Sequence, residues 1–185
     1  MIWTKKEQEA VQFSFIAHRK QKRKGTDIAY VSHPMIVGLI LARLGADNRV
    51  VVAGILHDII EDTDYEKEDI ENRFGEYVAD LVEEVSETDR DLPYKERKER
   101  AAAKLYEVSE DAVLIKAADV LSNMIDLETD LKKNGEDSFN IFHTDKNQKI
   151  KQIERVVNIL SFRLKDDELI LNLKETLNEI KKYED

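Results

Sequence analysis

The amino-acid sequence predicts an all-α protein, a bundle of about nine helices with little or no sheet. Charged residues make up 37% of the chain, and only six Gly and two Pro interrupt it, a composition that favours helices. Apolar residues also recur at spacings of three and four, as in Val78, Leu81, Val82 and Val85. Because 42% of the 185 residues are apolar, we expect one substantial core and a single domain over residues 1–185.

Capping residues delimit the first two predicted helices. Thr4 followed three residues later by Glu7 is a capping-box pattern, which predicts a helix over residues 5–18. Pro34 suits the first position of the second helix, and Gly45 suits the residue just after its end.

A third helix is predicted over residues 48–62, capped by Asp47 or Asn48. The β-branched residues 50–52 could equally begin a strand, because periodicity does not separate a buried helix from a buried strand. The apolar tract continues to about residue 62, which is long for a strand, so we prefer a helix.

The rest of the chain contains six further helical patterns, separated by Gly75, by a polar stretch and by the turn signal Asn134-Gly135. The last two patterns are amphipathic and form the C-terminal helices of the segment 145–183. The predicted helices span residues 65–74, 76–85, 94–108, 112–131, 147–164 and 167–183.

Composition excludes several classes of function. The chain has no Cys, which rules out disulfides, thiolate nucleophiles and Cys-based zinc sites. It shows neither a signal-peptide pattern nor a long apolar run, so we expect a cytoplasmic protein without a membrane partner. Its net charge of −10 argues against nucleic-acid binding, which requires a basic field. An oligomer is compatible with the sequence but is not predicted by it.

The most informative segment is the apolar run that ends in His57-Asp58. Burying an imidazole and a carboxylate costs free energy unless something pairs with them. A divalent metal ion would neutralise the carboxylate and use the imidazole lone pair. A satisfied ion pair, or a helix end at which Asp58 meets water, would explain this segment equally well.

Two further side chains suit the same metal ion. His33 precedes Pro34 at a helix start, and Asp119 is an acid inside a second mostly apolar helix. Two His nitrogens and two carboxylate oxygens suit Mn²⁺, Fe²⁺ or Zn²⁺ and leave positions open for water and substrate. Two alternatives remain at this stage: His33 could merely cap the helix, and Asp119 could pair with Lys116 in the core.

Two acids follow the His-Asp pair. Glu61 lies four residues after His57 and three after Asp58, so on one helix it would share their face. Adjacent helical residues point about 100° apart, so an ion shared by His57 and Asp58 would have to lie over the groove between them. Glu61 and Asp62 also begin an acidic stretch that could be a solvated face. Without a Cys or an obvious Ser nucleophile, the sequence favours direct attack by water at a metal centre.

Together these residues resemble the HD superfamily of metal-dependent phosphohydrolases, most closely its RelA/SpoT-type small alarmone hydrolases. The resemblance covers residues 13–127. Its motifs are His18-x-x-Gln21-x-Arg23-Lys24, Tyr30-x-x-His33-Pro34, His57-Asp58-x-x-Glu61-Asp62-Thr63 and Lys116-x-x-Asp119-x-x-x-Asn123.

The resemblance implies an HD-domain helical bundle with a divalent metal, usually Mn²⁺, although Zn²⁺ or Fe²⁺ would also suit the ligands. Glu61 and Asp62 would position or deprotonate the attacking water. Arg23 would lie against the guanine ring, Lys24 would act near the nucleotide, and Asn123 would contact the sugar. The implied metal ligands are His33, His57, Asp58 and Asp119.

The implied reaction is that of a stand-alone guanosine-3′,5′-bis(diphosphate) 3′-pyrophosphohydrolase, which converts (p)ppGpp to GDP or GTP and pyrophosphate. Three departures from the family pattern concern the substrate pocket more than the metal: Ala29 replaces a usual Pro, Lys20 a common Gly, and Val120 a frequent basic residue. The alternative function, with the same metal-dependent chemistry on another substrate, is that of an HD-type nucleotidase or NADPH 2′-phosphatase. A non-catalytic helical binding module is the third reading; its mark would be a missing ligand, and none of the four is missing.

Overall fold

Helices dominate the protein, for which a computed structural model describes residues 4–87, 91–142 and 144–184. These residues contain no strand, only an isolated antiparallel bridge between Lys22 and Ala29. The all-α expectation is confirmed. The helices are α1 (Lys5–Ala17), α2 (Ser32–Arg43), α3 (Asn48–Leu56), α4 (Ile59–Asp62), α5 (Lys67–Phe74), α6 (Glu76–Val85), α7 (Tyr94–Lys104), α8 (Glu110–Asn134), the 3₁₀ helix η1 (Gly135–Ile141), α9 (Lys146–Arg163) and α10 (Asp167–Lys181).

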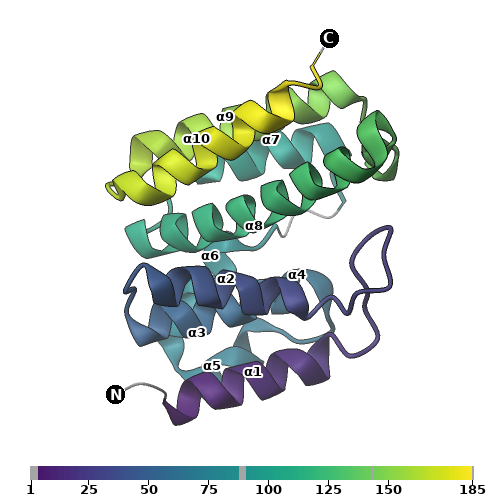
Figure 1. Ribbon diagram of the computed structural model, residues 1–185. Helices are drawn as coiled ribbons and strands as arrows, with labels where there is room; N and C mark the ends of the chain where they lie inside the picture. The colour runs from purple at the N-terminus through teal and green to yellow at the C-terminus, as the bar shows by residue number, and fades with distance from the viewer. Residues whose placement is uncertain (1–3, 88–90, 143, 185) are drawn as a thin grey trace.

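The long helix α8 runs between two groups of helices (Figure 1). It contacts α2, α3 and α6 on one side and α9 and α10 on the other. Helix α1 packs on α3, α5 on α6, and α7 on α9. No helix in the described ranges is long and apolar enough to cross a lipid bilayer.

One cluster of buried apolar side chains extends from Ala10 in α1 to Ile180 in α10. Helix α3 is buried over its apolar length, from Val50 to Leu56, as a tract that is apolar on every side requires. Each fully buried aliphatic side chain contributes roughly 1.5–3 kcal/mol to the free energy of unfolding. The core therefore surrounds the segment that carries the His-Asp pair.

Two glycines let α2 and α3 approach closely. A Cβ atom on Gly38 would lie 2.5 Å from Cγ1 of Ile55, and one on Gly54 would overlap Cδ1 of Leu41. Carbon atoms pack at about 3.5–4.0 Å, so neither position accommodates a side chain without movement of its neighbour. This contact between α2 and α3 holds His33, in α2, near His57, which directly follows α3.

Several helix ends follow the predicted capping chemistry. The capping box of α1 is formed: the Glu7 amide donates to Oγ1 of Thr4 at 3.2 Å, and the Thr4 amide donates to Oε2 of Glu7 at 2.6 Å. Gly135 ends α8 with a φ angle of 61°, a backbone region that favours Gly. The helix η1 that follows was not predicted.

Helix α2 begins earlier than expected. Val31 is its N-cap and Ser32 its first residue, so Pro34 occupies the third position instead of the first. Proline is tolerated there because the amides of the first turn have no intrahelical partner. His33 therefore belongs to the first turn of α2.

The prediction of one continuous helix over residues 48–62 is wrong. Helix α3 ends at Leu56, and α4 begins at Ile59, with Asp58 at φ −93° and ψ 0° between them. The His57 ring makes a hydrogen bond to the Gly54 carbonyl, which offers this acceptor a partner other than the helical amide ladder. The interruption lies at the two residues with the predicted chemistry.

Candidate metal centre

Four predicted ligand side chains, from three parts of the fold, meet at one point, which we call the ligand corner: His33 of α2, His57 and Asp58 between α3 and α4, and Asp119 of α8. Nε2 of His33 lies 3.1 Å from Oδ1 of Asp119 and 3.6 Å from Oδ2 of Asp58. Nε2 of His57 lies 3.1 Å from Oδ2 of Asp58 and 3.8 Å from Oδ1 of Asp119. Ligand atoms of His33, His57 and Asp58 all lie within 4.8 Å of one another. Because the helix is interrupted here, two adjacent residues reach the same point.

The two imidazoles are oriented by hydrogen bonds on their far side. Nδ1 of His57 donates to the Gly54 carbonyl at 2.7 Å, and Nδ1 of His33 lies 3.1 Å from Oγ of Ser122. Each Nε2 is thereby directed at the carboxylates, the arrangement usual for metal-binding His. Nε2 of His57 is buried and makes no aligned hydrogen bond within the described residues, although Oδ2 of Asp58 lies 3.1 Å away. A buried nitrogen that points at carboxylate oxygens without such a bond fits a divalent ion at this corner.

The charges at the corner are strongly coupled. Burial alone would lower the pKa of the His57 imidazole, but Asp58 and Asp119 outweigh it and raise this pKa to about 9. Burial opposes ionisation of Asp58 as well, yet His57 and His33 hold its pKa well below the usual range. The carboxylates therefore stay ionised, the form that a metal ion requires.

Outer contacts hold both acids. The Tyr30 hydroxyl donates to Oδ2 of Asp58 at 2.6 Å. Nζ of Lys116 lies 2.9 Å from Oδ2 of Asp119, and the Asn123 amide donates to Oδ1 at 2.6 Å. The Asp119–Lys116 pair considered from the sequence is therefore formed, but it leaves Oδ1 facing the imidazoles. The contact of Tyr30 was not predicted, although its place three residues before His33 in one motif was the available signal.

The two acids of α4 have different neighbours. Oε2 of Glu61 accepts from the Glu87 amide at 3.1 Å, and burial raises the pKa of Glu61 against the opposing charge of Lys116. Desolvation, followed by the Asp58 charge, raises the pKa of Asp62. The Asp62 backbone carbonyl accepts from Nε2 of Gln21 at 2.6 Å. Both acids are thus shifted toward the protonated form and lie next to the ligand corner.

The predicted nucleotide contacts lie along one edge of the corner. The Arg23 guanidinium forms an ion pair with Asp126 and donates to Oδ1 of Asn123 at 3.1 Å. It lies 6.0 Å from the centre of the Tyr30 ring. Lys24 is exposed and makes no hydrogen bond or ion pair with any described residue. Arg23 and Asn123 are therefore joined to the corner through Asp119, while Lys24 is left free to meet a ligand.

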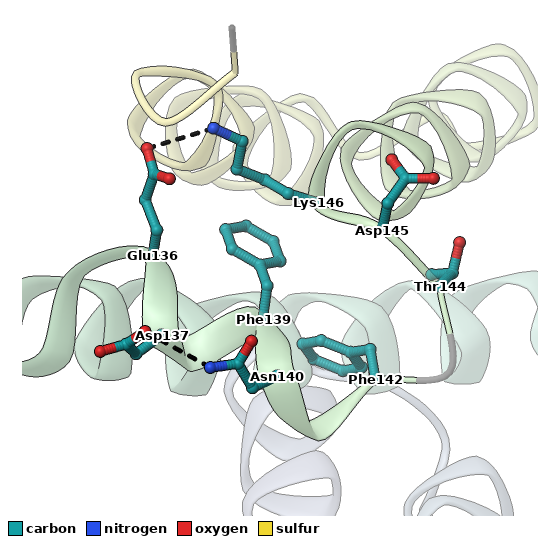
Figure 2. A pocket seen from close by; sticks show the side chains of 8 residues that line it. All are labelled: Glu136, Asp137, Phe139, Asn140, Phe142, Thr144, Asp145 and Lys146. Atoms are coloured by element: carbon teal, nitrogen blue, oxygen red, sulfur yellow. Dashed lines mark hydrogen bonds and ion pairs between the residues drawn. The ribbon is translucent and has the colours of Figure 1, made fainter.

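Two hollows lie away from the four ligands. A cavity of about 530 Å³ opens between η1 and the start of α9, and Figure 2 shows Glu136, Phe142 and Lys146 among its lining side chains. A second, of about 350 Å³, lies against α6 and α7 and reaches Lys116, the partner of Asp119. Neither contains a residue of the ligand corner.

Known proteins resemble this chain in sequence and in fold. A family model described as "HD domain" matches residues 10–144. The chain is 42% identical over 120 residues to the guanosine-3′,5′-bis(diphosphate) 3′-pyrophosphohydrolase of Aquifex aeolicus, a match that covers 63% of this chain but only 17% of that protein. It is 40% identical over 122 residues to human guanosine-3′,5′-bis(diphosphate) 3′-pyrophosphohydrolase MESH1, covering 64% of this chain and 68% of that one.

A solved structure shares the fold over most of the chain. It is described as "A metazoan ortholog of SpoT hydrolyzes ppGpp and plays a role in starvation responses". The superposition has a TM-score of 0.80 at 33% identity and covers 96% of each chain. The likeness therefore extends beyond the region of the family match to the C-terminal helices.

Proposed function

Because this chain belongs to the HD-domain family, we propose that it is a metal-dependent phosphohydrolase that removes pyrophosphate from the 3′ position of guanosine 3′,5′-bis(diphosphate). The products would be GDP from the tetraphosphate and GTP from the pentaphosphate. One observation carries the proposal: two His and two Asp side chains converge with both Nε2 atoms directed at carboxylate oxygens. Relatives about 40% identical in this region are named for that reaction.

The proposed metal ligands are His33, His57, Asp58 and Asp119. A divalent ion bound there supplies Lewis-acid chemistry and stabilises charge that develops on a phosphoryl oxygen. We propose Mn²⁺, and the mixed nitrogen and oxygen ligands would also suit Zn²⁺ or Fe²⁺. The buried Nε2 of His57, which points at the carboxylates without an aligned hydrogen bond, supports this assignment.

Glu61 and Asp62 are the proposed proton acceptors. Each would accept at a carboxylate oxygen the proton that the attacking water loses. The pKa of both is raised, chiefly by desolvation, and a carboxylate with a raised pKa is a better base near neutral pH.

Arg23, Asn123 and Lys24 are the proposed nucleotide contacts. Arg23 presents a planar guanidinium that can stack on a base, and its bond to Asn123 orients both groups. Lys24 lacks a partner in the described residues and can donate to a phosphate oxygen.

Two wider expectations remain predictions. We propose that the chain folds as a single domain, which the continuous buried cluster from Ala10 to Ile180 supports. The cytoplasmic location expected from the sequence is also a prediction. Neither affects the chemistry of the ligand corner.

The decisive experiment is a nucleotide panel with purified, Mn²⁺-loaded protein, in which released pyrophosphate and orthophosphate are measured separately. We expect pyrophosphate from guanosine 3′,5′-bis(diphosphate). Orthophosphate released only from NADPH or from a 5′-nucleotide would instead support the 2′-phosphatase or nucleotidase reading.

A pair of variants tests the ligand corner in the same assay. Asp58→Ala should abolish metal content and turnover while its circular dichroism keeps the helical signal. The matched control is Asp64→Ala, because Asp64 is exposed and makes no contact with the corner. Full metal-dependent hydrolysis by Asp58→Ala would show that the assignment is wrong.

A further inference from the structure

His18 is a buried imidazole to which the proposed mechanism gives no role. It is the C-cap residue of α1 and is only 1% exposed. Its Nδ1 makes a hydrogen bond to Oε1 of Gln21, while its Nε2 is buried with no hydrogen-bond partner among the described residues. Burying a polar ring costs free energy, so the single bond that His18 does make requires an explanation.

Gln21 joins the His18 ring to the end of α4. Its Nε2 donates to the Asp62 backbone carbonyl at 2.6 Å, and its Oε1 meets Nδ1 of His18. A carbonyl oxygen only accepts, so the Gln21 amide must direct Nε2 at Asp62 and Oε1 at His18. Nδ1 of His18 must therefore carry a hydrogen and donate it. A hydrogen on Nε2 would instead leave a buried N–H without a partner.

The bond to the Asp62 carbonyl is important because α4 is a single turn. Helix α4 comprises only Ile59–Asp62, and the last carbonyls of a helix have no amide partner within it. So short a helix is not stable by itself, and contacts from other segments must fix its end. Gln21 supplies such a contact from 41 positions earlier in the chain. The contact is made at the residue whose carboxylate is a proposed proton acceptor.

The turn from His18 to Gln21 also contacts Tyr30, the donor to Asp58. The Tyr30 amide donates to the Gln21 carbonyl at 2.9 Å, and the ring centres of His18 and Tyr30 lie 5.1 Å apart. The backbone of Gln21 thus holds Tyr30, while its side chain holds Asp62. This turn therefore connects the partner of a proposed metal ligand with one of the two acids of α4.

We propose that His18 and Gln21 are positioning residues for Asp62, joined in what we call the His18–Gln21–Asp62 link. The inference rests on the proposed function, in which Asp62 accepts a proton from the attacking water. His18 fixes the Gln21 amide through its Nδ1 hydrogen, and the amide fixes the Asp62 backbone, so the carboxylate keeps its direction. A misplacement of about 1 Å in an active site can cost about a hundredfold in rate.

Gln21→Met tests the link, because methionine keeps the apolar stem of the side chain without the amide donor. With saturating Mn²⁺, kcat should fall about tenfold to a hundredfold, while KM and Mn²⁺ affinity stay as in the wild type. Gln8→Met, at an exposed position of α1, is the matched control and should keep the wild-type kcat.

Two results for Gln21→Met would overturn the proposal. A contact that merely stabilises the fold would lower the denaturation midpoint and leave kcat unchanged. A loss of Mn²⁺ affinity as large as the loss of kcat would show that the contact acts on the ligand corner and not on Asp62.

Two substitutions at His18 separate the donor from the ring. His18→Asn places an amide N–H near the position of Nδ1, whereas His18→Leu fills the site without a donor. The Asn variant should retain most of the wild-type kcat, and the Leu variant should lose as much as Gln21→Met does. Circular dichroism checks that both variants are folded. Equal kcat values in the two folded variants would contradict the role of the Nδ1 hydrogen.

An imidazole ¹H–¹⁵N NMR spectrum tests the link without turnover. Of the signals from the four His residues, the one missing from His18→Asn belongs to His18. We expect its hydrogen on Nδ1 in the wild type, and faster exchange of that hydrogen in Gln21→Met. A hydrogen on Nε2 in the wild type would overturn the link. If the wild type hydrolyses no phosphate ester but the Nδ1 hydrogen behaves as expected, the proposed function is wrong and the link stands.

Discussion

The Tyr30 hydroxyl donates a hydrogen bond of 2.6 Å to Oδ2 of Asp58, the same oxygen that faces the Nε2 atoms of His57 and His33. Burial and the charges of Asp58 and Asp62 raise the pKa of Tyr30, so its hydroxyl stays protonated and remains a donor. Tyr30 is therefore a positioning residue, which fixes the direction of a proposed metal ligand.

Tyr30→Phe should weaken Mn²⁺ binding about tenfold to a hundredfold, the usual effect of removing an outer partner of a metal ligand. Direct Mn²⁺ titration measures this. Tyr106→Phe is the matched control, because Tyr106 is exposed and its hydroxyl makes no hydrogen bond with the described residues. Equal affinity in both variants would show that the Tyr30 contact does not orient Asp58.

Metal binding should be strongly pH-dependent. The His57 imidazole has its pKa raised from 6.5 to about 9 by its carboxylate neighbours, and it must lose its proton to bind a metal. Each unit of pH below 9 should therefore weaken Mn²⁺ about tenfold. Titrations at pH 6.5 and 7.5 measure the slope, and a flat affinity would contradict the protonation state inferred for His57.

The metal-free protein should show the opposite trend in stability. A group whose pKa is higher in the folded state stabilises the fold below its unfolded pKa. The contribution of His57 is therefore complete below pH 6.5 and is lost as the pH rises through 9. Denaturation with chelator present should show this loss, and His57→Gln should remove it.

Arg23→Ala should damage guanine-nucleotide turnover far more than general ester hydrolysis. The Arg23 guanidinium is bonded to Asn123 and Asp126 at the edge of the corner and to none of the four ligands directly. We expect kcat/KM for guanosine 3′,5′-bis(diphosphate) to fall at least about tenfold, as for other lost charged contacts. Hydrolysis of p-nitrophenyl phosphate should change little. The exposed Arg19→Ala is the control, and equal losses on both substrates would contradict a role in base recognition.

Gly54→Ala should destabilise the fold by about 1–3 kcal/mol, the usual cost of overpacking a core. The new Cβ would overlap Leu41, and Gly54 also supplies the carbonyl that orients His57. Chemical denaturation measures the change. Shrinking the neighbour in Gly54→Ala/Leu41→Val should cost less than the sum of the single variants. Strictly additive free-energy changes would show that the new Cβ at position 54 does not press on Leu41.

Much of the helical architecture was predictable because its signals are local. Thr4 and Glu7 cap α1 through bonds spanning three residues, and Gly135 ends α8 through its own backbone freedom. The observed helix ends differ from the predicted ones where tertiary contacts act on the backbone. The α3–α4 interruption at His57 coincides with a ring-to-carbonyl bond that no residue pattern specifies.

The sequence by itself determined the fold class and singled out His33, His57, Asp58 and Asp119, because ionisable side chains in apolar helices require a partner. Tertiary structure decided whether these residues meet and what surrounds them. Ser122 reaches His33 across 89 positions. Contacts of this kind depend on how distant helices pack, and helical periodicity indicates which face of a helix is buried but not which helix covers it.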